Sequence, residues 1–237
     1  MILPTHDMLE LLAEHAKAFA KFEHLLTSEN QKYNLTRITE AEQIRLRHFI
    51  DSMAALSVLD NLQNSLNKPL HVLDIGSGAG FPAIVLAIVR PTWHIVSLEA
   101  TEKKVRFQQK ICDEIGLDNV TVLHDRAEAL AHQPQYREQF DAVTARALAA
   151  MPILAELSLA FLNVGGLALY WKGPGEEIKT ALPAVDQMGA TAERTLAYTL
   201  QTNDAPVNLS LIICKKIKKT PKQYPRVFGM IKKKPLS

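Results

Sequence analysis

Residues 71–82 read His71-Val-Leu-Asp-Ile-Gly-Ser-Gly-Ala-Gly-Phe-Pro82, a short apolar run that leads directly into glycines at every second position. A run of this length is typical of a buried strand, and proline is favoured in the first turn of a helix. The segment therefore predicts a strand, a glycine-rich loop and a helix in direct succession. Ligands of open α/β sheets bind at the carboxyl ends of the strands, so the loop marks the expected site.

The same alternation of strand and helix continues along the chain. Apolar runs that predict further strands lie at residues 94–99, 120–123, 140–144 and 166–171, and a helical pattern follows each of them, the last at residues 176–188. Two late runs, at residues 191–200 and 209–217, have no long helix between them and predict an antiparallel hairpin at a sheet edge. This order predicts an α/β fold with a doubly wound, mostly parallel, seven-stranded sheet and right-handed crossovers.

Three regions follow one another along the chain. Apolar side chains recur at helical spacing in residues 1–68, so this region is expected to form an N-terminal helical cap. Residues 69–217 carry the strand and helix units and are expected to form the ligand-binding domain. Residues 218–237 contain three prolines, which exclude a long regular helix and predict an extended tail.

The composition is that of an ordinary globular chain. Its 237 residues are 47% apolar and 22% charged, which excludes wholesale disorder. No run of about 18 uncharged apolar residues occurs, so no membrane span is expected. The N-terminal segment mixes acidic side chains with leucines and resembles neither a signal nor a transit peptide, so a cytoplasmic location is expected. Cys112 and Cys214 match no metal-ligand spacing and are expected in the core, and no metal site is predicted.

The net charge of +2 conceals an asymmetry along the chain. Residues 211–237 carry nine basic and no acidic side chains, whereas the rest of the chain carries 18 basic against 25 acidic side chains. A basic tail on an acidic body is typical of a protein that binds a polyanion, most commonly nucleic acid. The alternative is a solvated tail that improves solubility. Tyr224 and Phe228 lie among the cations, where aromatic rings can stack on bases, and they favour nucleic acid.

The glycine loop and the acidic residues beside it indicate the class of ligand. Gly76 and Gly78 leave backbone amides open to close approach, and the G-x-G-x-G spacing differs from the dinucleotide and P-loop patterns. Asp74 precedes the loop, where it would repel a phosphate but can hold a cationic amino-acid group. Glu99 ends the second strand, where an acid can bind the ribose hydroxyls of an adenosine ligand or, alternatively, stabilise the start of the next helix. Together these features favour S-adenosylmethionine over NAD.

Polar residues also follow the next three strands. Asp125-Arg-Ala-Glu128 ends the third strand, where the amides of Ala127 and Glu128, or the Glu128 side chain, can read an adenine edge. Arg146 ends the fourth strand and Lys172 the fifth. Each cation can bind the cofactor carboxylate or a substrate phosphate, and the alternative is a surface ion pair.

Several motifs resemble those of one enzyme family. They are Asn34-Leu-Thr-Arg-Ile38, Arg47-His-Phe-Ile-Asp-Ser52, Leu73-Asp-Ile-Gly-Ser-Gly-Ala-Gly-Phe-Pro82, Leu98-Glu-Ala-Thr-Glu-Lys-Lys-Val-Arg-Phe107, Thr144-Ala-Arg-Ala147 and Thr220-Pro-Lys-Gln-Tyr-Pro-Arg226. In this order, and over nearly the whole chain, they resemble the small-subunit ribosomal RNA guanine-N7 methyltransferases (RsmG, also called GidB). The resemblance implies a class I, Rossmann-like methyltransferase that uses S-adenosylmethionine to methylate N7 of guanosine 527 in 16S rRNA of the 30S subunit.

The resemblance also implies roles for individual residues. The matching motifs place the cofactor on Gly76, Phe81, Ala127, Glu128 and Arg146. One departure is Ala83, where the family pattern more often has glycine. Cations outside the motifs of the cofactor site are candidate contacts to rRNA phosphates, which provide affinity but little sequence readout. These candidates are Arg37, Arg45, Arg47, Lys172, Lys222 and Arg226.

Guanine N7 carries a free lone pair, so methyl transfer to it requires no general base, and no catalytic residue is predicted. His48 and Asp51 can shape the guanine pocket, although His48 is equally explained as a packed or capping histidine. A monomer is expected.

Three other functions remain open on the residues alone. A methyltransferase with another RNA, a protein or a small molecule as acceptor would use the same cofactor loop, and one acting on a small molecule or protein should stay active without residues 218–237. A non-catalytic RNA-binding assembly factor would bind RNA without cofactor turnover. An NAD-dependent oxidoreductase is disfavoured by the glycine spacing and by the lack of a proton donor near the site.

Overall fold

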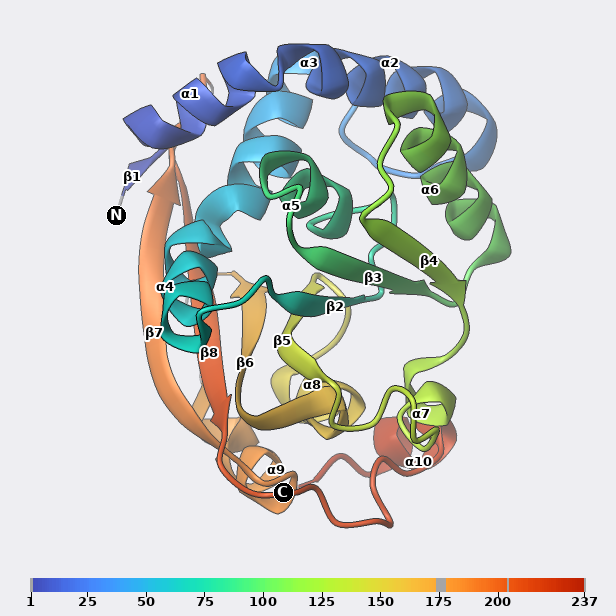
Figure 1. Ribbon diagram of the computed structural model, residues 1–237, viewed down its shortest axis with the longest axis vertical. Coiled ribbons are helices and arrows are strands. Elements are labelled where there is room, and N and C mark those ends of the chain that lie inside the picture. The colour runs from blue at the N-terminus through green and yellow to red at the C-terminus, as the bar shows by residue number, and fades with distance from the viewer. Residues whose placement is uncertain (1, 174–177, 204, 237) are drawn as a thin grey trace.

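One twisted sheet separates two layers of helices in the computed structural model, which describes residues 2–173, 178–203 and 205–236 (Figure 1). The sheet has eight strands in the order β1-β7-β8-β6-β5-β2-β3-β4. They are β1 (Ile2–Leu3), β2 (His71–Ile75), β3 (His94–Glu99), β4 (Val120–His124), β5 (Phe140–Arg146), β6 (Leu162–Lys172), β7 (Ala190–Leu200) and β8 (Val207–Lys216).

The predicted α/β fold with a doubly wound, mostly parallel sheet is confirmed, with one strand more than predicted. The additional strand β1 pairs in parallel with Thr199 and Leu200 of β7. Two residues are too few to form a recognisable pattern, which is why the sequence predicts seven strands. The hairpin of β7 and β8 is antiparallel, and β8 also pairs antiparallel with β6.

The strand order creates a switch point between β2 and β5. From β2 the chain proceeds to β3 and β4 on one side, then returns to β5 and β6 on the other side. The loops that leave the carboxyl ends of β2 and β5 therefore diverge and leave a crevice between them. The glycine loop follows β2, and Arg146 is the last residue of β5.

The helices of the first layer lie toward the N-terminal half of the chain and form the cap and its neighbours. They are α1 (His6–Glu14), α2 (Ala16–Tyr33), α3 (Ala41–Ile44), the π-helix η1 (Arg45–Ile50), η2 (Met53–Ala55), α4 (Leu56–Leu66), α5 (Ala83–Val89) and α6 (Glu102–Ile115). The second layer contains α7 (Ala127–Leu130), α8 (Met151–Ser158), η3 (Leu159–Phe161), η4 (Ile178–Ala181), α9 (Leu182–Gln187) and α10 (Phe228–Lys233). The predicted helix start at Glu176 lies outside the described residues.

The cap and one face of the sheet share a single apolar core. Phe19 and Phe22 of α2 pack on Phe49 of η1, with ring centroids 4.9 and 5.5 Å away. Phe22 also stacks on Phe81, directly after the glycine loop, at 5.0 Å. These rings belong to the same buried cluster as residues of β2, β5, β6 and β8. The cap is therefore fixed to the domain by the core itself.

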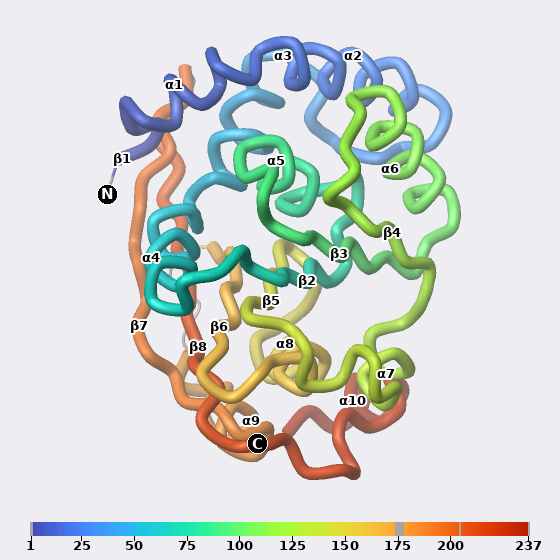
Figure 2. The backbone as a smooth tube through the Cα atoms, in the orientation of Figure 1, coloured from blue at the N-terminus to red at the C-terminus, as the bar shows by residue number. Residues whose placement is uncertain are grey.

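The C-terminal segment, expected as an extended arm, is instead folded against the second layer. It forms α10 and buries Ile231 and Leu236 in the core on that side of the sheet. Figure 2 shows this segment at the end of the molecule opposite the cap, beside α7 and α9. Its apolar side chains are few and lie in a stretch rich in lysine and proline, so the sequence pattern does not reveal their burial. In the described part of the chain, no helix has the length and apolar character needed to cross a membrane.

We predict that Phe49→Ala lowers the free energy of unfolding by about 3–5 kcal/mol, because it leaves a cavity where the cap meets the sheet. Unfolding in urea, followed by circular dichroism and by tryptophan fluorescence, should still show one shared transition. Leu66→Ala is the control, since Leu66 is 42% exposed at the end of α4, and it should change stability by less than about 0.5 kcal/mol. Two separate transitions would contradict a common core.

Candidate functional site

The glycine loop closes β2 with its backbone in the left-handed region. Gly76 has a φ of +69° and Gly78 one of +61°, which side-chain-bearing residues rarely adopt. A Cβ atom at Gly76 would also lie 2.6 Å from the Leu148 side chain in the loop after β5. The Gly76 amide donates to the carbonyl of Leu98 at 2.8 Å, which ties the loop to β3. Gly76 and Gly78 are half-buried. Their amides are bonded to the Leu98 carbonyl and the Glu99 carboxylate, so the expectation that these amides stay open is wrong.

Glu99 fixes the other side of the loop. Its Oε2 atom accepts a hydrogen bond from the amide of Gly78 at 3.0 Å, and its Oε1 atom accepts one from the amide of Thr101 at 2.8 Å. The side chain is nearly buried. Each carboxylate oxygen has a second lone pair, so the group retains acceptor capacity for the hydroxyls of a ribose. Both interpretations of Glu99 made from the sequence, ribose binding and stabilisation of the start of the next helix, fit this geometry. Its bond to Gly78 supports the loop in addition.

Asp74 is completely buried beneath the loop. Its Oδ1 atom accepts a hydrogen bond from Thr144 at 2.8 Å, whereas Oδ2 has no partner among the described residues. Burial raises the pKa of Asp74 to about 6, in spite of the Thr144 hydrogen bond. A buried carboxylate oxygen without a partner is costly unless a ligand or water supplies one. The Asp74 carboxylate therefore suits a cationic partner, such as the ammonium group of S-adenosylmethionine, at this end of the crevice.

The residues after β4 lie at the same carboxyl edge of the sheet as the glycine loop. Ala127 and Glu128 begin α7, and both are mostly shielded from solvent. The Nε atom of Arg126 donates to Oε1 of Glu128 at 2.6 Å. The Glu128 carboxylate is thereby held at the start of α7, where the sequence analysis expects contacts to an adenine.

Arg146 reaches from the end of β5 to the cap. Its Nη1 atom donates to Oδ2 of Asp51 at 2.9 Å and to the Arg47 carbonyl at 3.0 Å, and its Nη2 atom donates to Nδ1 of His48 at 2.9 Å. The guanidinium also lies 5.5 Å from the ring centroid of Phe81. The predicted roles of Arg146 in binding a carboxylate or phosphate thus compete with an ion pair to the cap.

His48 is buried against Phe81, with the two rings stacked at 4.4 Å. Because a guanidinium can only donate, Nδ1 of His48 is an acceptor, and the proton resides on Nε2, which lies 2.9 Å from the Thr36 hydroxyl. Burial, reinforced by the positive charge of Arg146, lowers the pKa of His48 to about 3. The imidazole is therefore neutral at physiological pH and has one defined tautomer.

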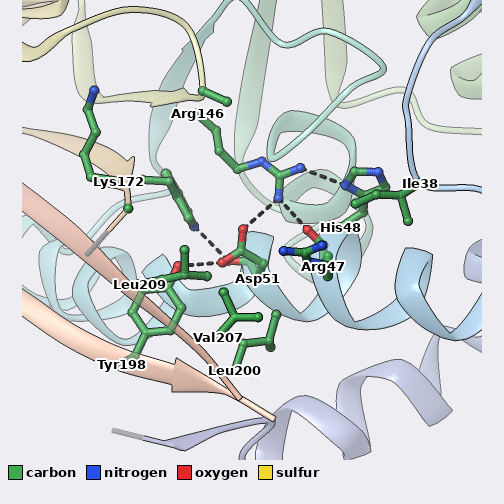
Figure 3. A pocket seen from close by; sticks show the side chains of 13 residues that line it. Ile38, Arg47, His48, Asp51, Arg146, Lys172, Tyr198, Leu200, Val207 and Leu209 are labelled. Carbon is green, nitrogen blue, oxygen red and sulfur yellow. Dashed lines mark hydrogen bonds and ion pairs between the residues drawn. The ribbon is translucent and has the colours of Figure 1, made fainter. Parts of the chain in front are cut away.

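A pocket of about 430 Å³ opens between the cap and the carboxyl ends of β5 and β6 (Figure 3). Polar groups line one side, and apolar side chains from the β7–β8 hairpin line the other. The polar lining is Arg47, His48, Asp51, Arg146, Lys172 and Tyr198, and the apolar lining includes Ile38, Trp171, Leu200, Val207 and Leu209.

The floor of this pocket is a hydrogen-bonded network around Asp51. The Tyr198 hydroxyl donates to Oδ1 of Asp51 at 2.5 Å, and the Trp171 indole donates to its backbone carbonyl at 2.8 Å. Burial raises the pKa of Asp51, and the nearby Arg146 charge opposes that rise. Burial also holds the pKa of the Tyr198 hydroxyl far above its usual range, so the phenol stays protonated.

Sequence reasoning missed Tyr198 and Trp171. Trp171 directly precedes Lys172 at a strand end, where the rule for open sheets directs a search. Tyr198 has no such signal, because it reaches the pocket through pairing of β7 with β8.

The candidate phosphate contacts fall into two groups. Arg37, Arg45, Arg47 and Lys222 are exposed. Lys172 is only 9% exposed and donates to the Ala149 carbonyl at 2.6 Å, so it lines the pocket and not an outer surface. Arg226 is engaged with Glu156 at 2.6 Å. No cluster of metal-ligating side chains is found in the residues that the structure describes, and both cysteines are buried.

A protein-family model described as rRNA small subunit methyltransferase G (GidB) matches residues 15–198. The chain belongs to this family. This membership confirms the family resemblance that the sequence motifs indicated. The ribosomal RNA small subunit methyltransferase G of Clostridium novyi (strain NT) is 40% identical and covers 98% of this chain and 97% of its own length. The protein of that name from Streptococcus sanguinis (strain SK36) is 39% identical and covers 96% of this chain and 94% of its own.

Solved structures of more distant proteins share the fold with this member of the methyltransferase G family. One, described as converting a disulfide bond into a thioacetal group during echinomycin biosynthesis, has a TM-score of 0.54 at 16% identity and covers 68% of this chain and 81% of its own. The [4+2]-cyclase SpnF has a TM-score of 0.51 at 14% identity and covers 70% of this chain and 82% of its own. Identities this low show the fold alone, and a cyclase among them shows that the fold does not specify the reaction.

We predict that His48 makes the protein less stable as the pH falls. Its pKa is about 3 in the folded state against an ordinary value of 6.5, so below pH 6.5 the unfolded chain binds a proton that the folded protein excludes. The contribution is complete above pH 6.5 and is lost toward pH 3, with a loss of about 2 kcal/mol already at pH 5. The measurement is the free energy of unfolding in urea between pH 7 and pH 5.

The control for this prediction is His48→Phe, which retains a ring against Phe81 and does not titrate. Its overall stability is expected to be lower, but its pH dependence should be shallower than that of the wild type. Equal slopes for the two proteins would show that His48 is not held neutral by burial.

Proposed function

We propose that the protein transfers the methyl group of S-adenosylmethionine to N7 of guanosine 527 in the 16S rRNA of the small ribosomal subunit. Family membership supports the reaction, and the observation that carries the proposal is the pocket beside the switch point. Its lining residue His48 stacks at 4.4 Å on Phe81, which directly follows the glycine loop. Its walls come from the cap, the ends of β5 and β6, and the hairpin. We also propose that the protein acts as a monomer in the cytoplasm, because one chain supplies both the loop and the pocket.

The cofactor is assigned to the crevice between β2 and β5. When bound, S-adenosylmethionine supplies a methyl group made electrophilic by its positively charged sulfur. In this proposal the backbone at Gly76 and Gly78 accepts the close approach of the ligand, and Asp74 holds the ammonium, directly or through water. Glu99 binds the ribose hydroxyls, and the residues at the start of α7 bind the adenine. Phe81 and Arg146, whose guanidinium lies 5.5 Å from the Phe81 ring centroid, complete the proposed cofactor contacts.

The pocket is assigned to the acceptor base. A volume of about 430 Å³ suits one nucleotide, and enzymes that modify a base remove it from its stack before reaction. Guanine N7 needs no deprotonation, so the protein contributes by binding and aligning the base with the methyl group, which can supply several kcal/mol. The methylated purine is cationic. The neutral state of His48 and the pairing of Arg146 with Asp51 limit the positive charge that would oppose it.

The RNA strand around the target base is assigned to the exposed cations near the pocket. Arg37 and Arg47 lie on the cap side, in the segments before and within η1. Such cations provide salt-dependent affinity and orient the RNA.

We predict that Gly76→Asp abolishes methyl transfer, because its side chain would occupy the space of Leu148, strain a left-handed position and place a charge in the crevice. The assay uses labelled S-adenosylmethionine and 30S subunits from a strain that lacks this gene, with the product mapped by mass spectrometry. A single N7-methylguanosine at position 527 is expected for the wild type. Transfer to another nucleotide, or none by a folded wild-type protein that binds the cofactor, would reject the proposed acceptor.

We predict that Arg47→Ala weakens binding to 30S subunits and reduces the slope of log affinity against log salt by about 1, since one phosphate contact is lost. Lys215→Ala is the matched control. Lys215 is exposed, but it pairs with Leu167 in the middle of β6, away from the carboxyl end that forms the pocket. Equal effects of the two substitutions would contradict an RNA path along the cap.

A further inference from the structure

The C-terminal segment is attached to the second helical layer from its beginning. At the end of β8, the buried Lys216 donates from Nζ to the carbonyls of Leu159 at 2.7 Å and Met188 at 2.8 Å, and it contacts the Thr220 hydroxyl. Arg137 then donates to the carbonyls of Thr220 at 2.9 Å and Tyr224 at 2.8 Å. These bonds fix the backbone where the sequence alone suggests a free arm.

Arg226 holds the following part of the segment. Its Nε and Nη2 atoms donate to the two oxygens of Glu156 at 2.8 and 2.6 Å, and its amide donates to Oε1 at 2.9 Å. Glu156 is completely buried on α8. Nη2 also donates to the Lys234 carbonyl at 3.0 Å, which closes the segment around α10. A bidentate pair with a buried carboxylate is a strong and geometrically specific contact.

Fixed in this way, α10 places Phe228 against Arg126, the residue that precedes α7. The Arg126 guanidinium carbon lies 4.7 Å from the centroid of the Phe228 ring, within the range of a cation–π contact. Arg126 in turn donates from Nε to Oε1 of Glu128 at 2.6 Å. Its side chain is 53% exposed, so without the ring its long chain would lose a constraint that keeps it beside Glu128.

We propose that the C-terminal segment positions the adenine end of the cofactor site, with Phe228 acting on Arg126 and Arg126 acting on Glu128. This inference rests on the proposed use of S-adenosylmethionine. Adenine carries an exocyclic amine that donates hydrogen bonds, and a carboxylate held by Arg126 is a matching acceptor. Phe228 and Arg126 are positioning residues in this arrangement, and they improve affinity by reducing the freedom that the ligand must otherwise restrict.

The test is a double-mutant cycle on S-adenosylmethionine binding, measured by calorimetry with the full-length protein. Phe228→Ala and Arg126→Ala should each weaken binding about three- to fivefold, the range of a cation–π contact. The double variant should bind no more weakly than either single one, because the two residues act in series. Phe228→Trp should retain affinity. Met230→Ala is the matched control, since Met230 lies on the same helix and is 55% exposed, and it should bind as the wild type does.

Steady-state kinetics separate positioning from damage to the fold. Phe228→Ala should raise the KM for S-adenosylmethionine by a similar factor and leave kcat unchanged at saturating cofactor. Additive effects in the cycle would overturn the proposal, because they would show that the two residues act independently. Unchanged cofactor affinity together with weaker 30S binding would also overturn it and would assign the segment to RNA binding. A folded wild-type protein that binds no S-adenosylmethionine would instead reject the proposed function itself.

Discussion

The Arg146 guanidinium is the group on which the geometry of the pocket depends. It joins the end of β5 to the cap through Asp51, His48 and the Arg47 carbonyl. Without it, a buried carboxylate and a buried imidazole would each lose a partner, and unpaired buried polar groups are costly. The π-helix η1 contains Arg47 and His48, and Asp51 directly follows its last residue. Single π-turns often occur at functional sites, and here the wider turn brings Arg47, His48 and Asp51 to one guanidinium.

This bridge and the shared core have the same consequence for function. The cap and the β7–β8 hairpin contribute walls of the pocket proposed for the acceptor, whereas the loops after β2 and β5 border the crevice proposed for the cofactor. Methyl transfer requires the two to be aligned to within a fraction of an ångström. A cap with a separate core would move as a unit, but the stack of Phe22, Phe81 and His48 continues from one region into the other. Rigid attachment therefore provides the alignment.

In the lysine-rich C-terminal segment, the charge pattern and the packing of the side chains indicate different roles. Its exposed lysines are the charges that predict a polyanion partner. By contrast, Arg226 forms an ion pair with Glu156, Phe228 packs on Arg126, and Ile231 is buried in the core. A buried carboxylate such as Glu156 needs a partner, and nothing near α8 in sequence supplies one. The partner arrives 70 residues later in the chain. Charge counts could not distinguish the two roles.

By itself, the sequence determined the fold class and indicated the loop after β2 as the place to seek a cofactor site, because both depend on local order. The run from His71 to Pro82 places a strand, a turn and a helix next to one another, and the alternation after it fixes which strand ends share an edge. Asp74, Gly76, Glu99 and Arg146 could be found because each lies within a few residues of a strand end. The tertiary structure alone decided which side chains join His48 and Asp51 around the pocket, and how the C-terminal segment is held against α8. Tyr198, Trp171 and Asp51 meet only through strand pairing and cap packing, and such long-range contacts leave no periodic signal in the chain.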